Sequence, residues 1–359
     1  MRKQTLVILT PAFPENESPE ASIWLPAKQS LVRCLNRNFP EVELVILSFQ
    51  FPVSRTPYRW NGNQVIPFGG GNRRHGHNWL VWLRVFKTLL RLRKEKQLIG
   101  LLSCWCAECC FVAHYFSKLY RVKHLCWICG QDARRPNRFV KRTRPAATEL
   151  VAMSDFLVDE FYKNHRIRPA HLIPDAVDPA LFDTTLKART IDILGAGSLS
   201  PLKRYDRFVE IVGAVRERIP HLQARLCGDG TEMKTLRQQI QGARLTGTLA
   251  LTGTLPQQAL LALMQQTKVF LHTSSYEGFG NVCIEALYAG AHVISFTRPM
   301  HQDIPHWHTV ATQEEMTALA VQLLEDNGTE YTPVLPFNMN DSARQFMQLF
   351  RAAGQHSTG

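Results

Sequence analysis

The sequence of 359 residues lacks any apolar run of the roughly 18–20 residues that a membrane-spanning helix requires. Its first apolar run, Leu6–Leu9, is short and ends at Thr10 and Pro11, a pattern typical of a buried strand rather than of a signal peptide. We therefore expect a cytoplasmic protein, either free or bound peripherally to the inner face of the membrane.

Acidic residues are scarce in the first half of the chain. Residues 1–175 hold 27 Lys and Arg against 13 Asp and Glu, a net charge of +14, whereas residues 176–359 hold 15 against 17, a net charge of −2. This surplus predicts an anionic partner, such as a membrane surface, a lipid-linked acceptor or an acidic glycan. We expect no nucleic acid partner, because the basic half carries no recognised nucleic-acid-binding motif. The segment 78–96 suits a packed amphipathic helix and a membrane-surface helix equally well.

Signatures of a metal site are weak. The chain has no Asp-x-Asp triplet, and its nine cysteines lack the context of a secreted disulfide framework. The groups Cys104–Cys110 and Cys126–Cys129 suggest zinc or an iron–sulfur cluster as one alternative. Against it, residues three apart on a strand face opposite ways, and cysteine packs well as a small buried side chain. We expect reduced thiols, no bound metal and no cofactor.

Short apolar runs alternate with amphipathic helical runs along the whole chain, which predicts parallel sheets covered by helices. Prolines interrupt the pattern near 173–179 and mark a boundary between two domains. We predict an α/β protein with two Rossmann-like domains, 1–175 and 176–335, and a segment 336–359 whose helix (about 342–353) packs back on the first domain. The expected strands are 6–9, 42–49, 99–104, 123–129, 149–153, 191–195, 224–227, 249–251, 269–272 and 292–296, and the expected helices are 23–35, 78–98, 155–164, 205–218, 233–241, 257–265 and 282–289.

The most informative segment is 274–290, which follows the apolar strand 269–272. Ligands of open α/β sheets bind beyond the carboxyl ends of strands. Gly278 and Gly280 let the backbone approach a ligand, and the helix that starts near Asn281 directs its dipole at the same place, which favours a diphosphate. Ionised Glu277 and Glu285 flank this cradle and can accept hydrogen bonds from sugar hydroxyls.

Two further turns place small residues after expected strands. The loop 195–203 ends in Lys203 at the start of a helix, where the helix dipole disfavours a cation. Neutralising a departing diphosphate would justify a lysine there, although a solvated surface lysine is the plain alternative. The turn 227–230 again sets glycines beyond a strand.

These residues together resemble a known family. The Glu277-x7-Glu285 pair, the Gly-Ser-Leu-x-Pro-x-Lys loop to Lys203, the Gly-Asp-Gly turn and Leu251-Thr252-Gly253 fall in the order and spacing of retaining glycosyltransferase family 4. The resemblance covers residues 185–300 strongly and the first half weakly. It implies the GT-B fold, in which two Rossmann-like domains face a cleft, with an acceptor-binding N-terminal domain and a donor-binding C-terminal domain.

The resemblance also implies roles. Lys203 would bind the donor diphosphate, Glu277 the transferred sugar and Glu285 the donor ribose, without a metal. The other donor-binding positions it implies are Gly197, Ser198, Gly228, Gly230, Thr252, Gly253, Gly278, Phe279, Gly280, Asn281 and Val282. Ser198 stands where family members usually carry a basic residue.

The acceptor side is less well defined. The stretch 101–105 lacks the His that family members often carry there. Gly130, Asp132, Arg134 and Arg135 resemble the following acceptor-side loop, so that Asp132 would orient an acceptor hydroxyl and the arginines would bind a phosphate. Asp132 equally fits a simple turn cap.

We therefore expect a retaining, metal-independent hexosyltransferase. It would take a sugar from a UDP- or GDP-linked donor to a glycan or lipid-linked acceptor, in surface polysaccharide or glycolipid synthesis. The alternatives are a sugar-nucleotide epimerase of the same fold and a non-catalytic protein that binds a nucleotide sugar.

Overall fold

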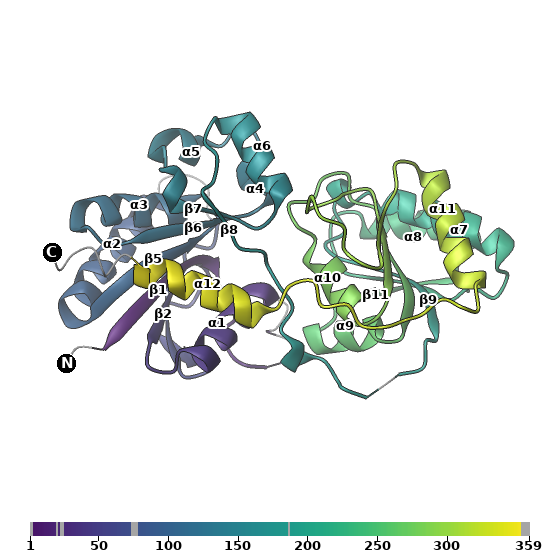
Figure 1. The fold of residues 1–359 in the computed structure, drawn as a ribbon, viewed down its shortest axis with the longest axis horizontal. Coiled ribbons are helices and arrows are strands. Elements are labelled where there is room, and N and C mark those ends of the chain that lie inside the picture. The colour runs from purple at the N-terminus through teal and green to yellow at the C-terminus, as the bar shows by residue number, and fades with distance from the viewer. Residues whose placement is uncertain (1–2, 19–20, 22–24, 73–77, 186, 353–359) are drawn as a thin grey trace. The chain divides into compact units, whose positions relative to one another are not determined.

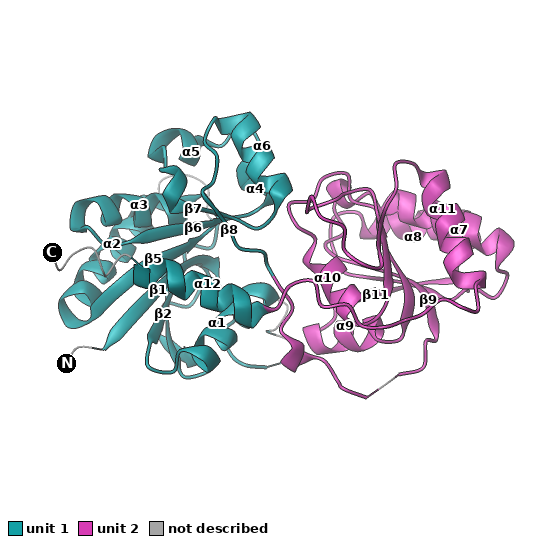
Figure 2. Ribbon diagram, in the orientation of Figure 1, with its two compact units in different colours: residues 1–175, 339–359 teal, residues 176–338 magenta. Residues whose placement is uncertain are grey.

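The computed structural model describes residues 3–18, 21, 25–72, 78–185 and 187–352. The chain divides into two compact units (Figure 2). Unit 1 consists of Met1–Asp175 with Met339–Gly359, and unit 2 of Ala176–Asn338. Each unit is a parallel sheet with helices packed on it, which is the predicted fold class. No helix within the described residues is both long enough and apolar enough to cross a membrane.

The sheet of unit 1 has the strand order β3-β4-β2-β1-β5-β6-β7-β8. Only the β3–β4 hairpin is antiparallel. The order therefore reverses between β1 and β5. The strands are β1 (Gln4–Ala12), β2 (Glu43–Phe51), β3 (Tyr58–Trp60), β4 (Asn63–Pro67), β5 (Gln97–Cys104), β6 (His124–Ile128), β7 (Leu150–Ala152) and β8 (His171–Leu172).

Helices bury this sheet on its faces (Figure 1). Val85 and Leu89 of α2 and Phe116 of α3 pack with Val7 and Val45 of the central strands in one apolar cluster. Because helices cover the central strands, β1 and β2 read as almost continuous apolar runs. The helices of unit 1 are α1 (Pro26–Asn38), α2 (Asn78–Glu95), α3 (Glu108–Tyr120), α4 (Gly130–Ala133), α5 (Arg138–Thr143), α6 (Asp155–His165) and α12 (Met339–Ala352).

Helix α12 is part of unit 1 although it follows unit 2 in the sequence. It packs beside α1, and the ring of Phe346 meets that of Trp127 edge-on, with 5.1 Å between centroids. The ring of Phe350 lies so close over Gly100 that a Cβ there would be 2.2 Å from it. Ser342 Oγ donates a hydrogen bond of 2.9 Å to the carbonyl of Pro174.

The sheet of unit 2 is wholly parallel, with the order β11-β10-β9-β12-β13-β14. Its order reverses between β9 and β12. The strands are β9 (Ile191–Ala196), β10 (Ala224–Cys227), β11 (Leu249–Gly253), β12 (Thr267–His272), β13 (His292–Ser295) and β14 (Trp307–Thr309), and the helices are α7 (Tyr205–Arg218), α8 (Met233–Gly242), α9 (Gln257–Met264), α10 (Asn281–Tyr288) and α11 (Gln313–Glu325).

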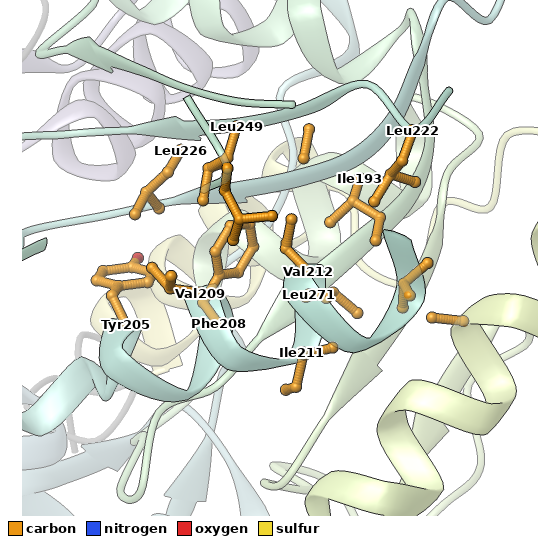
Figure 3. Packing of buried hydrophobic residues seen from close by; sticks show 14 of the residues in the cluster. Ile193, Tyr205, Phe208, Val209, Ile211, Val212, Leu222, Leu226, Leu249 and Leu271 are labelled. Atoms are coloured by element: carbon orange, nitrogen blue, oxygen red, sulfur yellow. The ribbon is translucent and has the colours of Figure 1, made fainter. Parts of the chain in front are cut away.

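The core of unit 2 forms where α7 lies on the sheet (Figure 3). Phe208 and Val212 of α7 are fully buried, and they share one cluster with Ile193, Leu226 and Leu271 of three neighbouring strands. Burying side chains of this size contributes about 1.5–3 kcal/mol each. This packing holds the carboxyl ends of β9, β10 and β12 in fixed register.

Several predicted bounds need correction. The helix expected to reach Leu98 ends at Glu95, because Gln97 and Leu98 already pair with β1. The strand expected to include Cys129 ends at Ile128, and Cys129 caps α4 instead. Ile23, the expected start of a helix, and residue 353, the expected end of the last helix, lie outside the described residues. The sequence reading missed the β3–β4 hairpin, α3, α4, α5, β8, β14 and α11.

The contact of α12 with the sheet yields a stability prediction. Phe346→Ala removes a fully buried ring from Trp127 and leaves a cavity, so it should lower the free energy of unfolding by about 3–5 kcal/mol. The matched control is Gln345→Ala on the exposed side of the same helix, which should stay within about 0.5 kcal/mol of the parent. Urea denaturation measures both. Equal midpoints for the two variants would contradict the packing described.

Candidate active site

Two loops meet at the point where the strand order of unit 2 reverses. One follows β9 and contains the short 3-10 helix η4 (Pro201–Lys203), and the other runs from the end of β12 to α10. In parallel sheets, the carboxyl ends of strands on either side of such a reversal leave room for a ligand. The residues that these two loops bring together are therefore candidates for ligand binding.

Hydrogen bonds tie the two loops to each other. Thr273 Oγ1 donates to the carbonyl of Lys203 over 2.9 Å. The backbone N–H and the hydroxyl of Ser275 both donate to the carbonyl of Leu202, over 3.1 and 3.2 Å. The position of Lys203 is thus set by the loop that carries Glu277, although 74 residues separate the two in sequence.

Lys203 Nζ and Glu277 Oε2 form a hydrogen-bonded ion pair, and each side chain is about one-fifth exposed (20% and 21%). His272, at the end of β12, lies with its Nε2 3.4 Å from the same carboxylate oxygen. Burial by itself would raise the pKa of Glu277, but His272 and Lys203 beside it lower that pKa to about 2. The carboxylate is therefore ionised and accepts hydrogen bonds.

The segment that follows Glu277 is buried and shaped by glycine. Gly280 has a φ of +88°, which an L side chain adopts only with strain, and it immediately precedes α10 at Asn281. Phe279 is buried with its ring 5.7 Å from that of Phe337, and this contact anchors the loop. The amino end of α10 therefore directs its positive dipole toward the loop of Glu277.

Two of the glycines predicted at the donor site are required by backbone packing, whether or not a ligand binds there. A Cβ at Gly228 would lie 1.9 Å from the carbonyl oxygen of Gly197, and one at Gly230 would lie 2.3 Å from that of Leu199. Backbone hydrogen bonds join these loops, from Gly197 N to the carbonyl of Cys227 (3.0 Å) and from Leu199 N to that of Asp229 (2.9 Å). Only glycine allows the loops after β9 and β10 to pack backbone against backbone.

The remaining donor-side residues occupy the same edge of the sheet. Thr252 and Gly253 end β11, and the carbonyl of Gly253 accepts a hydrogen bond from Gly228 N over 2.8 Å. Ser198 is exposed in the loop after β9. Glu285 lies in α10, where it accepts a hydrogen bond of 3.3 Å from Gln257 Nε2. Gly278 is buried and Val282 half-buried. The ligand contacts of all these residues stay predictions.

In unit 1 the acceptor-side residues form a capped turn. Asp132 is buried, and its Oδ2 accepts a hydrogen bond of 2.8 Å from Cys129 N at the start of α4. Burial raises the pKa of Asp132 to about 8. Gly130 is half-buried at the start of this helix, whereas Arg134 and Arg135 are exposed. The capping role, which the sequence left as an alternative, is the one visible in the contacts of Asp132.

The sequence reading assigned no role to two buried titratable residues. His272 ends β12, directly after the apolar run of that strand, and a polar residue at the carboxyl end of a strand was an available signal. Lys28 in α1 is buried in unit 1, with its Nζ 3.5 Å from Asp175 Oδ2 and 3.3 Å from the ring centroid of Trp127. Trp127 and Asp175 lie 99 and 147 residues after Lys28 in the sequence, so no local sequence pattern predicts these contacts.

Three cysteines of unit 1 lie close together. The sulfur atoms of Cys106, Cys110 and Cys126 lie within 4.8 Å of one another and are buried. The closest pair, Cys106 and Cys110, is 3.8 Å apart. Cys129 is not in this group, in agreement with the expectation that residues three apart in an extended chain face different ways.

The glycine packing is testable. Gly228→Ala places a methyl group against the carbonyl of Gly197, so it should lower the free energy of unfolding by roughly 2–4 kcal/mol and separate the two loops. Gly242→Ala, at the end of α8, meets open space and should change stability by less than about 1 kcal/mol. Denaturant titrations compare them. If both variants matched the parent, the loops would not be packed as described.

Comparison with known proteins agrees with this geometry. Residues 179–327 match the family described as Glycosyl transferases group 1. The chain is 30% identical over 103 residues to the 2-deoxystreptamine N-acetyl-D-glucosaminyltransferase of Niallia circulans, covering 29% of this chain and 26% of that protein. It is 26% identical over 147 residues to the UDP-N-acetylglucosamine–peptide N-acetylglucosaminyltransferase GtfA subunit of Streptococcus pneumoniae, covering 41% of this chain and 29% of that subunit. The matches thus span less than a third of these relatives.

The similarity in fold extends over the whole chain. The crystal structure of Anabaena HepE in complex with UDP and glucose superposes with a TM-score of 0.65 at 16% identity, covering 98% of both chains. At this identity the match bears on the fold alone, and assignment to family 4 within the group stays a prediction. Residues 179–327 of the C-terminal unit thus match the Glycosyl transferases group 1 family, and the two parallel-sheet units have the GT-B fold.

Proposed function

We propose that this protein is a retaining, metal-independent glycosyltransferase that moves a hexosyl group from a UDP-linked donor to an anionic glycan or lipid-linked acceptor. The observation that carries the proposal is the Lys203–Glu277 pair at the strand-order reversal of unit 2, beside the amino end of α10. A cation, an ionised carboxylate and a helix amino end at one point suit a sugar diphosphate.

The pair has a chemical use in this reaction. When the donor binds, Lys203 would turn from Glu277 toward the diphosphate and stabilise the negative charge that grows as the sugar leaves. Glu277, kept ionised by His272 and by the lysine, would accept hydrogen bonds from the sugar hydroxyls. Glu285, steadied by Gln257, would hold the ribose.

The proposed transfer needs no nucleophile from the protein. The bond between the anomeric carbon and the diphosphate oxygen breaks, and the acceptor oxygen forms its bond on the same face of the sugar. The acceptor proton passes to the departing phosphate. Positioning and charge stabilisation are then the main contributions of the protein. The name of the Streptococcus pneumoniae relative supports a UDP-linked donor. The names of both relatives lead us to include an N-acetylhexosamine among the sugars proposed.

Unit 1 supports an anionic acceptor. A cavity of about 690 Å³ is lined by Arg135, Arg138, Lys141 and Arg144, with no acidic side chain among its lining residues. Four cations around one cavity attract a phosphate or a carboxylate. This cavity includes Arg135, for which the sequence predicted a phosphate contact.

The surface of helix α2 supports the proposal that the protein binds a membrane surface, where it would encounter a lipid-linked acceptor. Trp79 and Leu83 are 54% and 48% exposed. Arg84 and Lys87 are exposed on the same helix. Exposed apolar side chains beside basic side chains on one helix are typical of helices that bind an anionic bilayer surface. This contact is proposed as peripheral.

The central prediction concerns Lys203. Lys203→Ala should reduce kcat/KM for sugar transfer by roughly 100- to 1000-fold, because it removes one charged donor from the leaving group. Lys234→Ala, an exposed lysine of the same unit, should leave kcat/KM within about twofold of the parent. Initial rates with a panel of UDP-sugars and a lipid-linked acceptor measure both. Full activity in Lys203→Ala would end the proposal.

The same assay separates the alternative functions. Retention is read from the anomeric configuration of the product by NMR, and metal independence from rates that do not change when Mg²⁺ or Mn²⁺ is added. Conversion of the donor without any acceptor would establish an epimerase instead. Saturable UDP binding without any turnover would establish a binding protein.

The basic cavity yields a separate prediction. The double variant Arg138→Glu/Lys141→Glu should raise KM for an anionic acceptor at least about tenfold and leave KM for the donor unchanged, because two attractive charges become repulsive. Lys118→Glu, an exposed lysine of α3 in the same unit, is the control. An unchanged acceptor KM in the double variant would assign the acceptor to another surface.

A further inference from the structure

Unit 1 contains a buried group of two histidines and a carboxylate that the proposed reaction does not use. His114 lies in α3, His124 begins β6, and Glu149 ends the short 3-10 helix η2 (Ala147–Glu149). Metal-ligating atoms of these three residues all lie within 4.8 Å of one another. The group lies outside residues 179–327, so the family match does not account for it.

The distances in this group match those between ligands of one metal ion. His114 Nδ1 lies 3.2 Å and His124 Nδ1 lies 3.7 Å from the same oxygen, Glu149 Oε1. Zinc binds N and O ligands at about 2.0–2.2 Å, so two ligands at a tetrahedral angle lie about 3.4 Å apart. The two measured distances bracket this value.

The nitrogen of His124 that faces Glu149 makes no hydrogen bond among the described residues. His124 is 3% exposed, and among the described residues no group is placed to form a hydrogen bond with its buried Nδ1. Glu149 Oε1, at 3.7 Å from it, lies beyond hydrogen-bond distance. A buried polar atom that makes no hydrogen bond destabilises the folded state. A cation between this nitrogen and the carboxylate would remove that cost.

The outer contacts hold the rings and the carboxylate in a ligating pose. His124 Nε2 lies 2.8 Å from Ser103 Oγ, which fixes the ring and leaves Nδ1 aimed at Glu149. Glu149 Oε2 accepts a hydrogen bond of 2.7 Å from Ala146 N, which leaves Oε1 for the histidines. Hydrogen bonds of this kind to the distal atoms of ligands are the usual support of protein metal sites.

We propose that His114, His124 and Glu149 bind one divalent metal ion of the zinc class, with a water as the fourth ligand. Two imidazoles and a carboxylate suit such an ion, whereas magnesium and calcium prefer oxygen ligands alone. The Glu149 side chain is 16% exposed while both histidines are buried, so the ion enters from the carboxylate side. The ion would join α3, β6 and η2 and so stabilise unit 1.

Metal titration of the complete, tag-free chain tests this site. Protein stripped with a chelator and then desalted should bind one equivalent of Zn²⁺ in calorimetry, and its Tm should rise by several degrees because the ion binds the folded state. Co²⁺ should give visible absorption of a four- or five-coordinate ion without a thiolate charge-transfer band. Absence of saturable Zn²⁺ binding would overturn the proposal.

Variants locate the ion. Glu149→Gln keeps an acceptor for Ala146 N and removes the charge, so it should weaken Zn²⁺ binding at least about tenfold and abolish the Zn²⁺-dependent rise in Tm. His114→Gln should weaken binding by roughly 100-fold. A cooperative thermal transition of metal-free Glu149→Gln shows that the variant folds, and the Tm rise is a readout that a merely structural hydrogen-bond network would not produce.

Two controls address the other candidate sites in the chain. His308→Gln changes the stacked histidines of unit 2, where His308 Nε2 lies 3.1 Å from His292 Nδ1, and should leave Zn²⁺ binding unchanged. Cys126→Ser changes the buried thiol group and should also leave it unchanged. Loss of the bound ion in Cys126→Ser, or parental affinity in both Glu149→Gln and His114→Gln, would refute the assignment.

Discussion

The candidate active site of unit 2 depends on the contact between Lys203 and Glu277, made where the strand order of the sheet reverses. Each charge is four-fifths buried, so neither is stable there without the other or without a ligand that replaces it. The pairing holds both side chains in place. In the proposed reaction it would also favour the binding of a diphosphate, because the lysine would exchange one anion for another at little cost in desolvation.

Backbone packing around the Lys203–Glu277 pair restricts the residue types of the neighbouring loops. The loops after β9, β10 and β11 hydrogen-bond to one another through their main chains, and Gly228 and Gly230 are required because carbonyls of the neighbouring loop occupy the space of their side chains. Glycine after a strand therefore indicated the edge of the sheet at which these loops meet. For these two positions the visible cause is loop-to-loop contact rather than direct approach to a ligand.

The elements that the sequence predicted best are those with strong local patterns. Helix α7 has the predicted bounds, because its apolar face is regular and Phe208 and Val212 are fully buried, and β10 also matches its predicted range. Helix α3 was missed, because its cysteines, His114 and aromatic residues blur the contrast between its faces. The β3–β4 hairpin was missed because its strands are only three and five residues long, too short for a clear alternating pattern.

The same reasoning explains why the residues of the candidate site in unit 2 leave a signal in the sequence and the buried groups of unit 1 do not. Glycine turns, a helix amino end and one lysine, which would suit a diphosphate, each leave a local spacing in the sequence. The buried charges of unit 1 are assembled from distant segments instead. Lys28 contacts Trp127 and Asp175, and Glu149 contacts His114 and His124. The sequence around each of these residues contains no motif that would single it out. Only the fold brings these partners into contact, so their chemistry is visible in the structure alone.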